Sequence, residues 1–230
     1  MLEDFLQCRA ERIMINKANN YGKFILLWAG ELISQIGGGL SSFGLGVYVF
    51  KQSGRASDMA LITLFGFLPS LLLSAPAGVL ADKYDRRLLM MIGDGCSGAG
   101  VVFILFCMIN DGATLIQICI GVFISSIFAS LLEPSYRATI TDLLTKEEFS
   151  KASGLVSLAG SAKYLFSPII AGFLLSISDV KLLLLIDICT FFLTVLSTAV
   201  VRRNIDNKKM EIRDRFSVRL KEGWRAVYER

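Results

Sequence analysis

The stretch Gly78-Val-Leu-Ala-Asp82-Lys-Tyr-Asp-Arg86-Arg87 decides the fold of this chain, because it places five charges between two long apolar segments. Upstream, residues 59–81 are 23 positions without a charge, and downstream, residues 88–109 are 22 positions with one. Each segment is long enough to cross a hydrocarbon core of about 30 Å as a helix. The charged stretch is therefore predicted to be a tight turn at a membrane face.

The acid and the arginines of this turn have different electrostatic needs. Arg86 and Arg87 begin the downstream helix and can extend to lipid headgroups. Asp82 ends the upstream helix, where a carboxylate faces the negative end of the helix dipole. We therefore expect Asp82 to need a cation, or the positive N-terminal end of another helix, as a partner.

The pattern G-x-L-A-D-K-x-x-R-R between a second and a third spanning helix resembles motif A of the major facilitator superfamily, G-x-L-A-D-[RK]-x-G-R-[RK]. The seven matching positions are Gly78, Leu80, Ala81, Asp82, Lys83, Arg86 and Arg87. Asp85 stands where the motif usually has glycine, so the turn is expected to be more acidic and less able to adopt a positive φ. In this departure from the motif, the chain resembles the macrolide and enterobactin exporter branch of the superfamily. A generic positively charged loop explains the arginines but not the acid at this distance from a glycine.

Composition points to an integral membrane protein. The 230 residues are 53% hydrophobic, and their mean hydropathy is +0.58. The five cysteines lack the spacing of metal ligands, and there is no histidine, so no metal site and no cofactor are predicted. An intramembrane enzyme needs a nucleophile with a base, or a metal cluster, within the spans. The sequence offers neither, and we predict that the protein is not an enzyme.

The chain is predicted to be an all-α membrane protein with one six-helix bundle over 24–201. A cytoplasmic N-terminal arm over 1–23 precedes the bundle, and a basic cytoplasmic tail over 202–230 follows it. The first segment is too long for the apolar core of a signal peptide. The six spans are expected at 24–50, 59–81, 88–109, 113–134, 152–177 and 182–201.

The distribution of lysine and arginine predicts which side of the membrane each loop occupies. The N-terminal arm carries four, the Asp82 turn three, the loop after the fourth span three and the tail ten. The opposite side carries only Lys51, Arg55 and Lys181. Because basic residues are retained in the cytoplasm, both termini are predicted to be cytoplasmic, in a cell membrane. The net charge of +4 reflects this bias, and no nucleic-acid partner is expected.

The resemblance also implies a three-plus-three inverted repeat and a second six-helix half. Residues 74–80 on the second span faintly echo residues 167–174 on the fifth, as in such repeats. The superfamily normally has twelve spans, so the chain is interpreted as an N-terminal half, either truncated or acting as a dimer. In the tail, apolar residues recur at helical spacing between basic ones, which predicts a surface helix that begins a linker; a solvated terminal helix is the alternative. These tail residues are Phe216, Leu220, Trp224, Val227 and Tyr228.

Two ionisable residues lie deep within predicted spans, where each needs a partner or a task. Glu31 is seven residues into the first span, before Gln35 and a glycine stretch at 37–39 that we expect to be flexible. It is interpreted either as a proton acceptor or as a structural hydrogen-bonding residue. Lys163 lies near the middle of the fifth span and either contacts substrate, pairs with Glu31 in coupling, or forms a static ion pair.

Further charges are assigned to a network around the turn. Asp94 lies two turns deeper than Arg87 on one helix face and is expected to pair with a basic residue of the gate rather than to touch substrate. Glu133 and Arg137 have the i, i+4 spacing of a helix pair, and Pro134 is expected to break or kink the fourth span. Asp187 is interpreted as a water-facing or helix-starting acid.

Two helix motifs bear on coupling and direction of transport. The mid-helix arginine of many proton-coupled drug antiporters has no counterpart between Ile116 and Leu132, which leaves proton coupling through that arginine in doubt. On the fifth span, Pro168 and Gly172 partly match an antiporter glycine-proline pattern, with small residues in place of glycines. This pattern favours export over uptake and close approach of a neighbouring helix, the alternative being a kink without directional meaning.

The combined prediction is a secondary active transporter that works by alternating access in the lipid bilayer. The resemblance implies export of an amphipathic small molecule, such as a macrolide or a siderophore, by antiport with protons or another cation. Asp82, Arg86 and Arg87 would form the movable latch. Alternatives are a channel, an uptake carrier, or a non-transporting receptor or assembly protein on the same fold.

Overall fold

A computed structural model describes residues 2–110 and 112–203, with side chains described over 20–110, 112–145 and 147–201. The described residues form helices joined by short connections, and six spans are long and apolar enough to cross a membrane, as the sequence predicted. The predicted surface helix of the tail lies outside the described residues. The helices are α1 (Leu2–Ser53), α2 (Ala56–Lys83), α3 (Arg86–Asn110), α4 (Leu115–Ala129), α5 (Leu132–Leu143), α6 (Lys146–Ile177) and α7 (Val180–Arg203).

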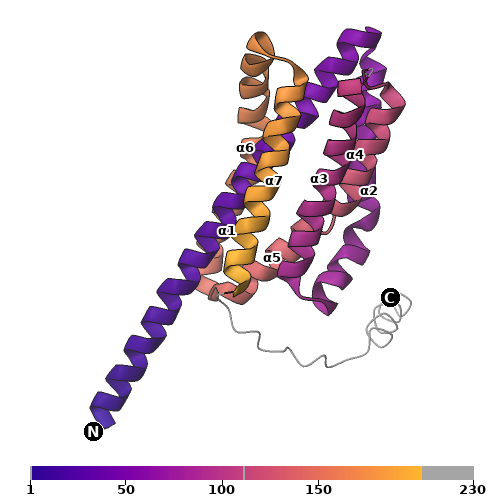
Figure 1. Ribbon diagram of the computed structural model, residues 1–230. Helices are drawn as coiled ribbons and strands as arrows, with labels where there is room; N and C mark the ends of the chain where they lie inside the picture. The colour runs from indigo at the N-terminus through magenta and orange to yellow at the C-terminus, as the bar shows by residue number, and fades with distance from the viewer. Residues whose placement is uncertain (1, 111, 204–230) are drawn as a thin grey trace.

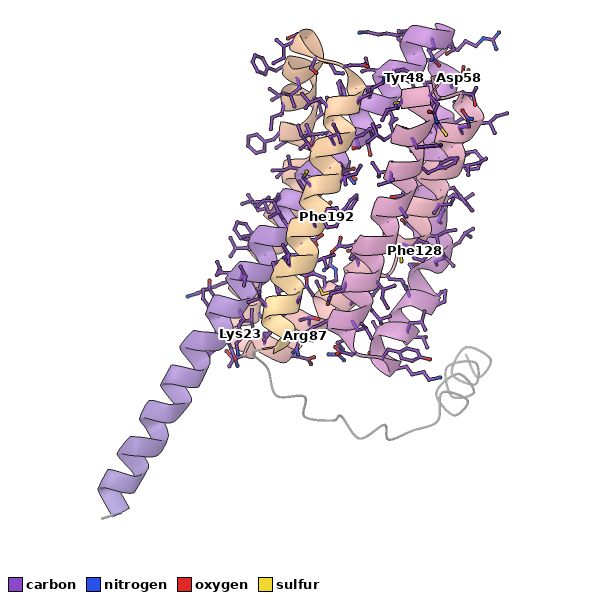
Figure 2. All side chains as sticks on the ribbon, in the orientation of Figure 1. Lys23, Tyr48, Asp58, Arg87, Phe128 and Phe192 are labelled. Carbon is purple, nitrogen blue, oxygen red and sulfur yellow. The ribbon has the colours of Figure 1, made fainter. Side chains whose placement is uncertain are left out.

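The bundle consists of two groups of three long helices (Figure 1). On one side α1 packs against α6 and α7, and on the other α4 packs against α2 and α3. The contact between α3 and α7 joins the two groups, and the N-terminal part of α1 extends beyond the bundle. Lys23 and Arg87 lie at one end of the bundle, and Tyr48 and Asp58 lie at the other (Figure 2). We call these the Arg87 end and the Tyr48 end.

Glycines spaced seven residues apart bring α1 against α7. A Cβ atom at Gly37 would clash with the Thr190 hydroxyl group, so the two backbones can approach only because the side chain is absent. The glycine stretch at 37–39 was predicted to be flexible, and this prediction is wrong, because α1 is unbroken there and packs tightly. The glycines that meet α7 residues in this way are Gly30 at Ser197, Gly37 at Thr190 and Gly44 at Leu183.

Small residues also build the crossing of α3 and α4. Cβ atoms at Gly100 and Gly121 would each run into the other helix, since Gly100 faces the Gly121 carbonyl group and Gly121 faces Ile104. Beside this crossing, the hydroxyl groups of Ser97 and Ser125 are hydrogen-bonded at 2.7 Å. Such small-residue contacts replace the hydrophobic driving force that lipid cannot supply.

The fourth span is broken earlier than predicted and extends further. It was expected to end at Pro134, but the helix is interrupted at Ser130 and Leu131 and continues as α5 to Leu143. Pro134 has no N–H group, and its ring crowds the carbonyl group four residues before it, which is that of Ser130. The interruption therefore falls one turn ahead of the proline. Pro134 itself sits in the first turn of α5, where the missing donor costs little.

Candidate functional site

The turn between α2 and α3 is closed by the residue that departs from the motif. Oδ1 of Asp85 accepts a hydrogen bond from the backbone N–H of Arg87 at 3.1 Å, and its carbonyl oxygen accepts one from Leu89 N–H at 3.0 Å. Asp85 therefore caps the N-terminus of α3, where a carboxylate also suits the helix dipole. The backbone of Tyr84, within the turn, is extended at φ −110° and so has no positive φ. The acid that replaces the usual glycine thus has a structural role of its own.

Arg86 connects three helices at the Arg87 end. Its Nε donates to the carbonyl oxygen of Ala81 in α2 at 3.3 Å, and its Nη1 donates to the carbonyl oxygen of Ala138 in α5 at 3.0 Å. Nη1 also donates to Oδ1 of Asp142 at 2.6 Å, and Nη2 lies 3.8 Å from Oδ1 of Asp82. The side chain is 18% exposed. We call these five residues the Arg86 clamp.

Asp142 is a clamp residue that the sequence analysis missed. The fourth span was predicted to end at 134, so residue 142 was placed in a loop. In the structure α5 carries Asp142 back over the α2–α3 turn, within reach of Arg86. The available signal was the acid itself, because it lies on the same predicted membrane side as the two arginines of the turn.

The remaining motif residues lie on the surface of this bundle. The Asp82 side chain is 66% exposed, and its predicted partner in another helix end stays a prediction. Lys83 is exposed, and its Nζ lies 5.5 Å from the centre of the Tyr84 ring. Arg87 is half-buried. No atom lies within 4 Å of where a Cβ atom of Gly78 would be, so that position is open along the face of α2.

Glu133 and Arg137 form the expected helix pair. Nε and Nη2 of Arg137 donate to Oε1 of Glu133 at 3.0 and 2.9 Å, and both side chains are more than half exposed. Across the described residues, the hydrogen bonds and ion pairs of the Arg86 clamp do not include this pair. Its predicted membership of a gate network stays a prediction.

Glu31 and Lys163 approach each other in the interior without a direct ion pair. Glu31 is 7% exposed and its Oε1 accepts a hydrogen bond from Gln35 Nε2 at 2.7 Å. Lys163 is half-buried and attracts the carboxyl groups of both Glu31 and Asp187. Among the described side chains, no Lys163–Glu31 contact is short enough to be a salt bridge. The side chain of Lys163 packs against Gly39 of α1, the helix that also carries Glu31.

Two buried aspartates correct the sequence-based interpretation. Asp187 was interpreted as water-facing or helix-starting, but it lies two turns into α7 and is 1% exposed. Asp94 was expected to pair with a base of the gate, yet it is 0% exposed and neither of its carboxyl oxygens has a hydrogen-bond partner among the described residues. The sequence signal was present, because each is an acid inside an apolar span. For Asp94, the expected basic residue is not a hydrogen-bond partner among the described residues.

In the glycine-proline segment of α6, residues other than the glycine pack against the neighbouring helices. α6 runs without interruption through Pro168, and Gly172 is exposed with no atom within 4 Å of a Cβ position. Ala171 is fully buried, and the Ser167 hydroxyl group donates to the Ile36 carbonyl oxygen at 3.0 Å. The predicted close approach therefore occurs at Ser167 and Ala171, facing α1 and α7.

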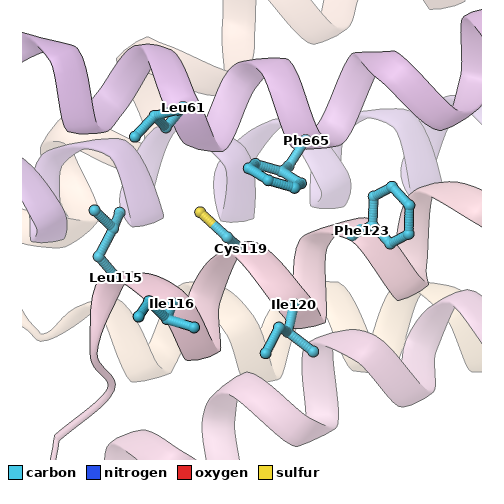
Figure 3. Close-up of a pocket in the computed structure, with 7 residues that line it drawn as sticks. All are labelled: Leu61, Phe65, Leu115, Ile116, Cys119, Ile120 and Phe123. Atoms are coloured by element: carbon cyan, nitrogen blue, oxygen red, sulfur yellow. The ribbon is translucent and has the colours of Figure 1, made fainter.

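An apolar pocket of about 280 Å³ lies between α2 and α4 towards the Tyr48 end (Figure 3). No polar side chain lines it, so it has no group that could orient a ligand. Among the described residues, no group of three or more acidic or cysteine side chains is placed to hold a metal ion. The pocket lining is Leu61 and Phe65 from α2 and Leu115, Ile116, Cys119, Ile120 and Phe123 from α4.

Six spanning helices, a charged clamp at one end and carboxyl groups in the interior are features of a membrane carrier. Comparison with known protein families identifies the family to which the chain belongs. The chain belongs to the transmembrane secretion effector family of the major facilitator superfamily, whose model matches residues 20–229. It is thus a multi-pass membrane protein with the fold of one half of a facilitator, from a family of transporters rather than enzymes.

The relatives that match the chain include macrolide efflux proteins. It is 27% identical to macrolide efflux protein A of Streptococcus pyogenes over 192 residues, which are 82% of this chain and 47% of that protein. It is 26% identical to the staphyloferrin A transporter of Staphylococcus aureus, over 76% of this chain and 43% of that one. The chain spans about half the length of the curated relatives it matches.

Proposed function

We propose that this chain is the N-terminal half of a secondary carrier that exports an amphipathic small molecule by alternating access, in antiport with protons. The observation that carries the proposal is the Arg86 clamp. It holds the corner of α2 and α3 against α5 while leaving Asp82 exposed at the edge. An exposed acid beside a fixed arginine can be bound in one state of the carrier and released in the other.

The complete carrier in this proposal contains a second six-helix bundle, from the same chain or from a partner. The chain spans about half of its relatives, and α2 and α6 expose many large apolar side chains. Docking of Asp82 against the positive end of a helix in that bundle would close the Arg87 end. A latch worth a few kcal/mol is enough to shift a two-state population substantially.

The Arg87 end is assigned to the cytoplasm, in the cell membrane. Most basic residues lie on this side of the predicted topology, and such residues are retained inside. A cysteine replacing the exposed Tyr84 should react with an impermeant thiol reagent only after the cytoplasmic side is opened. A cysteine replacing the exposed Ser53 should react in intact cells. The reverse pattern contradicts the orientation.

The proposed substrate class is taken from two relatives that differ in what they transport. A macrolide efflux protein and a staphyloferrin A transporter both match the chain. Macrolide export is the first proposal because several macrolide efflux proteins are among the matches. Siderophore transport is the second, supported by the staphyloferrin relative. Cells carrying the complete carrier should accumulate less labelled macrolide than control cells when a proton gradient is present.

Asp82→Asn is the central test of the latch. The substitution keeps size and removes charge, and we expect export to be lost while membrane abundance stays the same, because the Asp82 side chain is 66% exposed. Asp58→Asn, which removes a half-buried acid at the Tyr48 end, is the control for loss of a negative charge. Normal export by the Asp82 variant would remove the latch from the mechanism.

A further inference from the structure

The second helix, α2, contains a proline near the middle of its length. Pro69 is buried and lies inside a helix that runs without interruption over Ala56–Lys83. Because proline has no N–H group, the Phe65 carbonyl oxygen loses its helical donor, and the proline ring crowds it. Sharp bends in long helices are almost always found at prolines and a few similar features. Pro69 is therefore the position at which this part of α2 bends most readily.

A serine of α4 holds α2 on either side of this proline. The Ser126 hydroxyl group, on a side chain that is 6% exposed, donates to the carbonyl oxygen of Gly66. A hydroxyl group has one proton, so the 3.2 Å contact between the Ser70 and Ser126 oxygens is a hydrogen bond that Ser70 donates. Serine side chains commonly support the backbone around a proline in a spanning helix. We call Gly66 and Ser70 of α2 with Ser126 of α4 the Ser126 joint.

The two helices touch at the Ser126 joint and leave a gap beyond it, towards the Tyr48 end. A Cβ atom at Gly66 would lie 3.3 Å from Cγ1 of Val122, so α2 and α4 are in close contact there. Next to this contact, the rings of Phe65 and Phe123 pack edge to face with their centroids 5.9 Å apart. These rings form one end of the apolar pocket of about 280 Å³ (Figure 3). The joint therefore lies at the inner end of the pocket.

The segment of α2 on the pocket side of the joint, residues 56–68, has few other attachments. Its one buried side chain among the described residues is Ile62, which packs in the apolar core. Met59 approaches α1 at Gly46 with the end of a flexible side chain. Apart from the joint, no described side chain in this segment forms a hydrogen bond or ion pair with another helix. Movement of the segment therefore breaks few contacts once the joint opens.

We propose that the Ser126 joint controls a local motion of α2, in which residues 56–68 swing away from α4 about Pro69. When the hydrogen bond from Ser126 to Gly66 breaks, the pocket opens and exposes Cys119, which is 8% exposed in the state described here. Hydrogen bonds between spanning helices are weak enough to allow this, since each shifts an equilibrium by about three-fold to ten-fold. The motion takes place within one bundle, away from the Arg86 clamp. It requires neither the proposed substrate nor antiport.

Thiol labelling of the complete carrier in membrane vesicles measures this opening without transport. The vesicles are treated with N-ethylmaleimide for increasing times, and the labelled fraction of Cys119 is measured by peptide mass spectrometry. Ser126→Ala removes the hydroxyl group of the joint, so Cys119 should react about three to ten times faster. Ser125→Ala is the matched control, because that neighbouring hydroxyl group bonds to Ser97 in α3 rather than to α2. It should leave the rate at Cys119 unchanged.

Cys107 in α3 distinguishes a local motion from general loosening of the bundle. It is half-buried and packs against the same apolar core as Ile62. Equal acceleration at Cys107 and Cys119 would mean that Ser126→Ala loosens the whole bundle, and it would overturn the proposal. Pro69→Ala restores a backbone donor to α2. Added to Ser126→Ala, it should therefore bring the labelling of Cys119 back towards the wild-type rate.

The outcomes separate this motion from the proposed function. An unchanged rate at Cys119 in Ser126→Ala overturns the proposal, even if the carrier exports macrolide. A faster rate confined to Cys119 supports it, even if no export occurs, in which case the proposed function fails alone. If Ser126→Ala is not recovered as a folded protein, Ser70→Ala decides. It removes only the second hydrogen bond of the joint, so a smaller acceleration supports the proposal and an unchanged rate overturns it.

Discussion

The Arg86 clamp and the interior of the bundle differ in how well their ionisable groups are hydrogen-bonded. At the clamp, a partly exposed arginine meets a carboxylate at 2.6 Å and two carbonyl oxygens. In the interior, two aspartates that are almost wholly buried have oxygens with no hydrogen-bond partner among the described residues. The clamp groups are therefore hydrogen-bonded although water could also have solvated them. The buried aspartates have oxygens without hydrogen bonds although water does not reach them. An interior built only for stability would show the reverse, which indicates that the buried acids serve function.

The largest expected effect tests the packing that creates the dry interior. Gly100→Val should prevent stable folding, because its side chain would meet the Gly121 carbonyl group and the Ser125 backbone, neither of which can move aside cheaply. Overpacking of this kind costs about 1–3 kcal/mol and sometimes more. The measurement is the folded fraction after detergent extraction. Gly95→Val is the control, since no atom lies within 4 Å of that Cβ position, and equal losses in both variants would contradict the assignment.

The next effect addresses the clamp. Arg86→Ala removes the only described group that joins α2, α3 and α5 through side-chain hydrogen bonds to two carbonyl groups and Asp142. Hydrogen bonds to a charged group are worth about 1.5–3 kcal/mol, so a lower melting temperature and loss of export are expected. Asp142→Asn should show a smaller change in the same direction. Full export by Arg86→Ala would show that the clamp is only structural.

A third substitution should move stability in the opposite direction. Asp94→Leu replaces a buried carboxyl group that has no described partner with an apolar side chain of similar size. The unfolding free energy should rise by about 1–3 kcal/mol, because a buried unsatisfied polar group is removed, while proton-driven export is lost. Thermal melting in detergent and vesicle transport measure the two effects. A melting temperature that falls instead would mean that the carboxyl group has a stabilising partner.

The smallest effect belongs to an exposed pair. Arg137→Ala breaks the ion pair with Glu133, whose two side chains are 65% and 73% exposed. Such a pair contributes about 0.3–0.5 kcal/mol, so melting temperature and export should barely change. Export that is lost without a loss of stability would place Glu133 and Arg137 in the gate network that the sequence suggested, and would extend the comparison to a third charged region.

Much of the fold follows from short-range features of the sequence. Apolar length and the five charges at 82–87 were enough to predict six spans and the α2–α3 turn, because a helix must satisfy its own backbone in lipid. The i, i+4 spacing similarly gave the pair of Glu133 and Arg137. The interruption of the fourth span was placed too late, since the effect of Pro134 falls on a carbonyl group one turn earlier.

The sequence by itself determined the membrane class, the number of spans and the corner motif, because these depend on local hydropathy and spacing. Only the tertiary structure decided which charges meet. Asp142 reaches Arg86 because α5 continues past the proline, and Lys163 comes against Gly39 because α6 packs on α1. Those contacts join residues 56 and 124 positions apart. No local sequence pattern predicts such long-range contacts. They depend on how closely whole helices approach each other at faces that carry glycine.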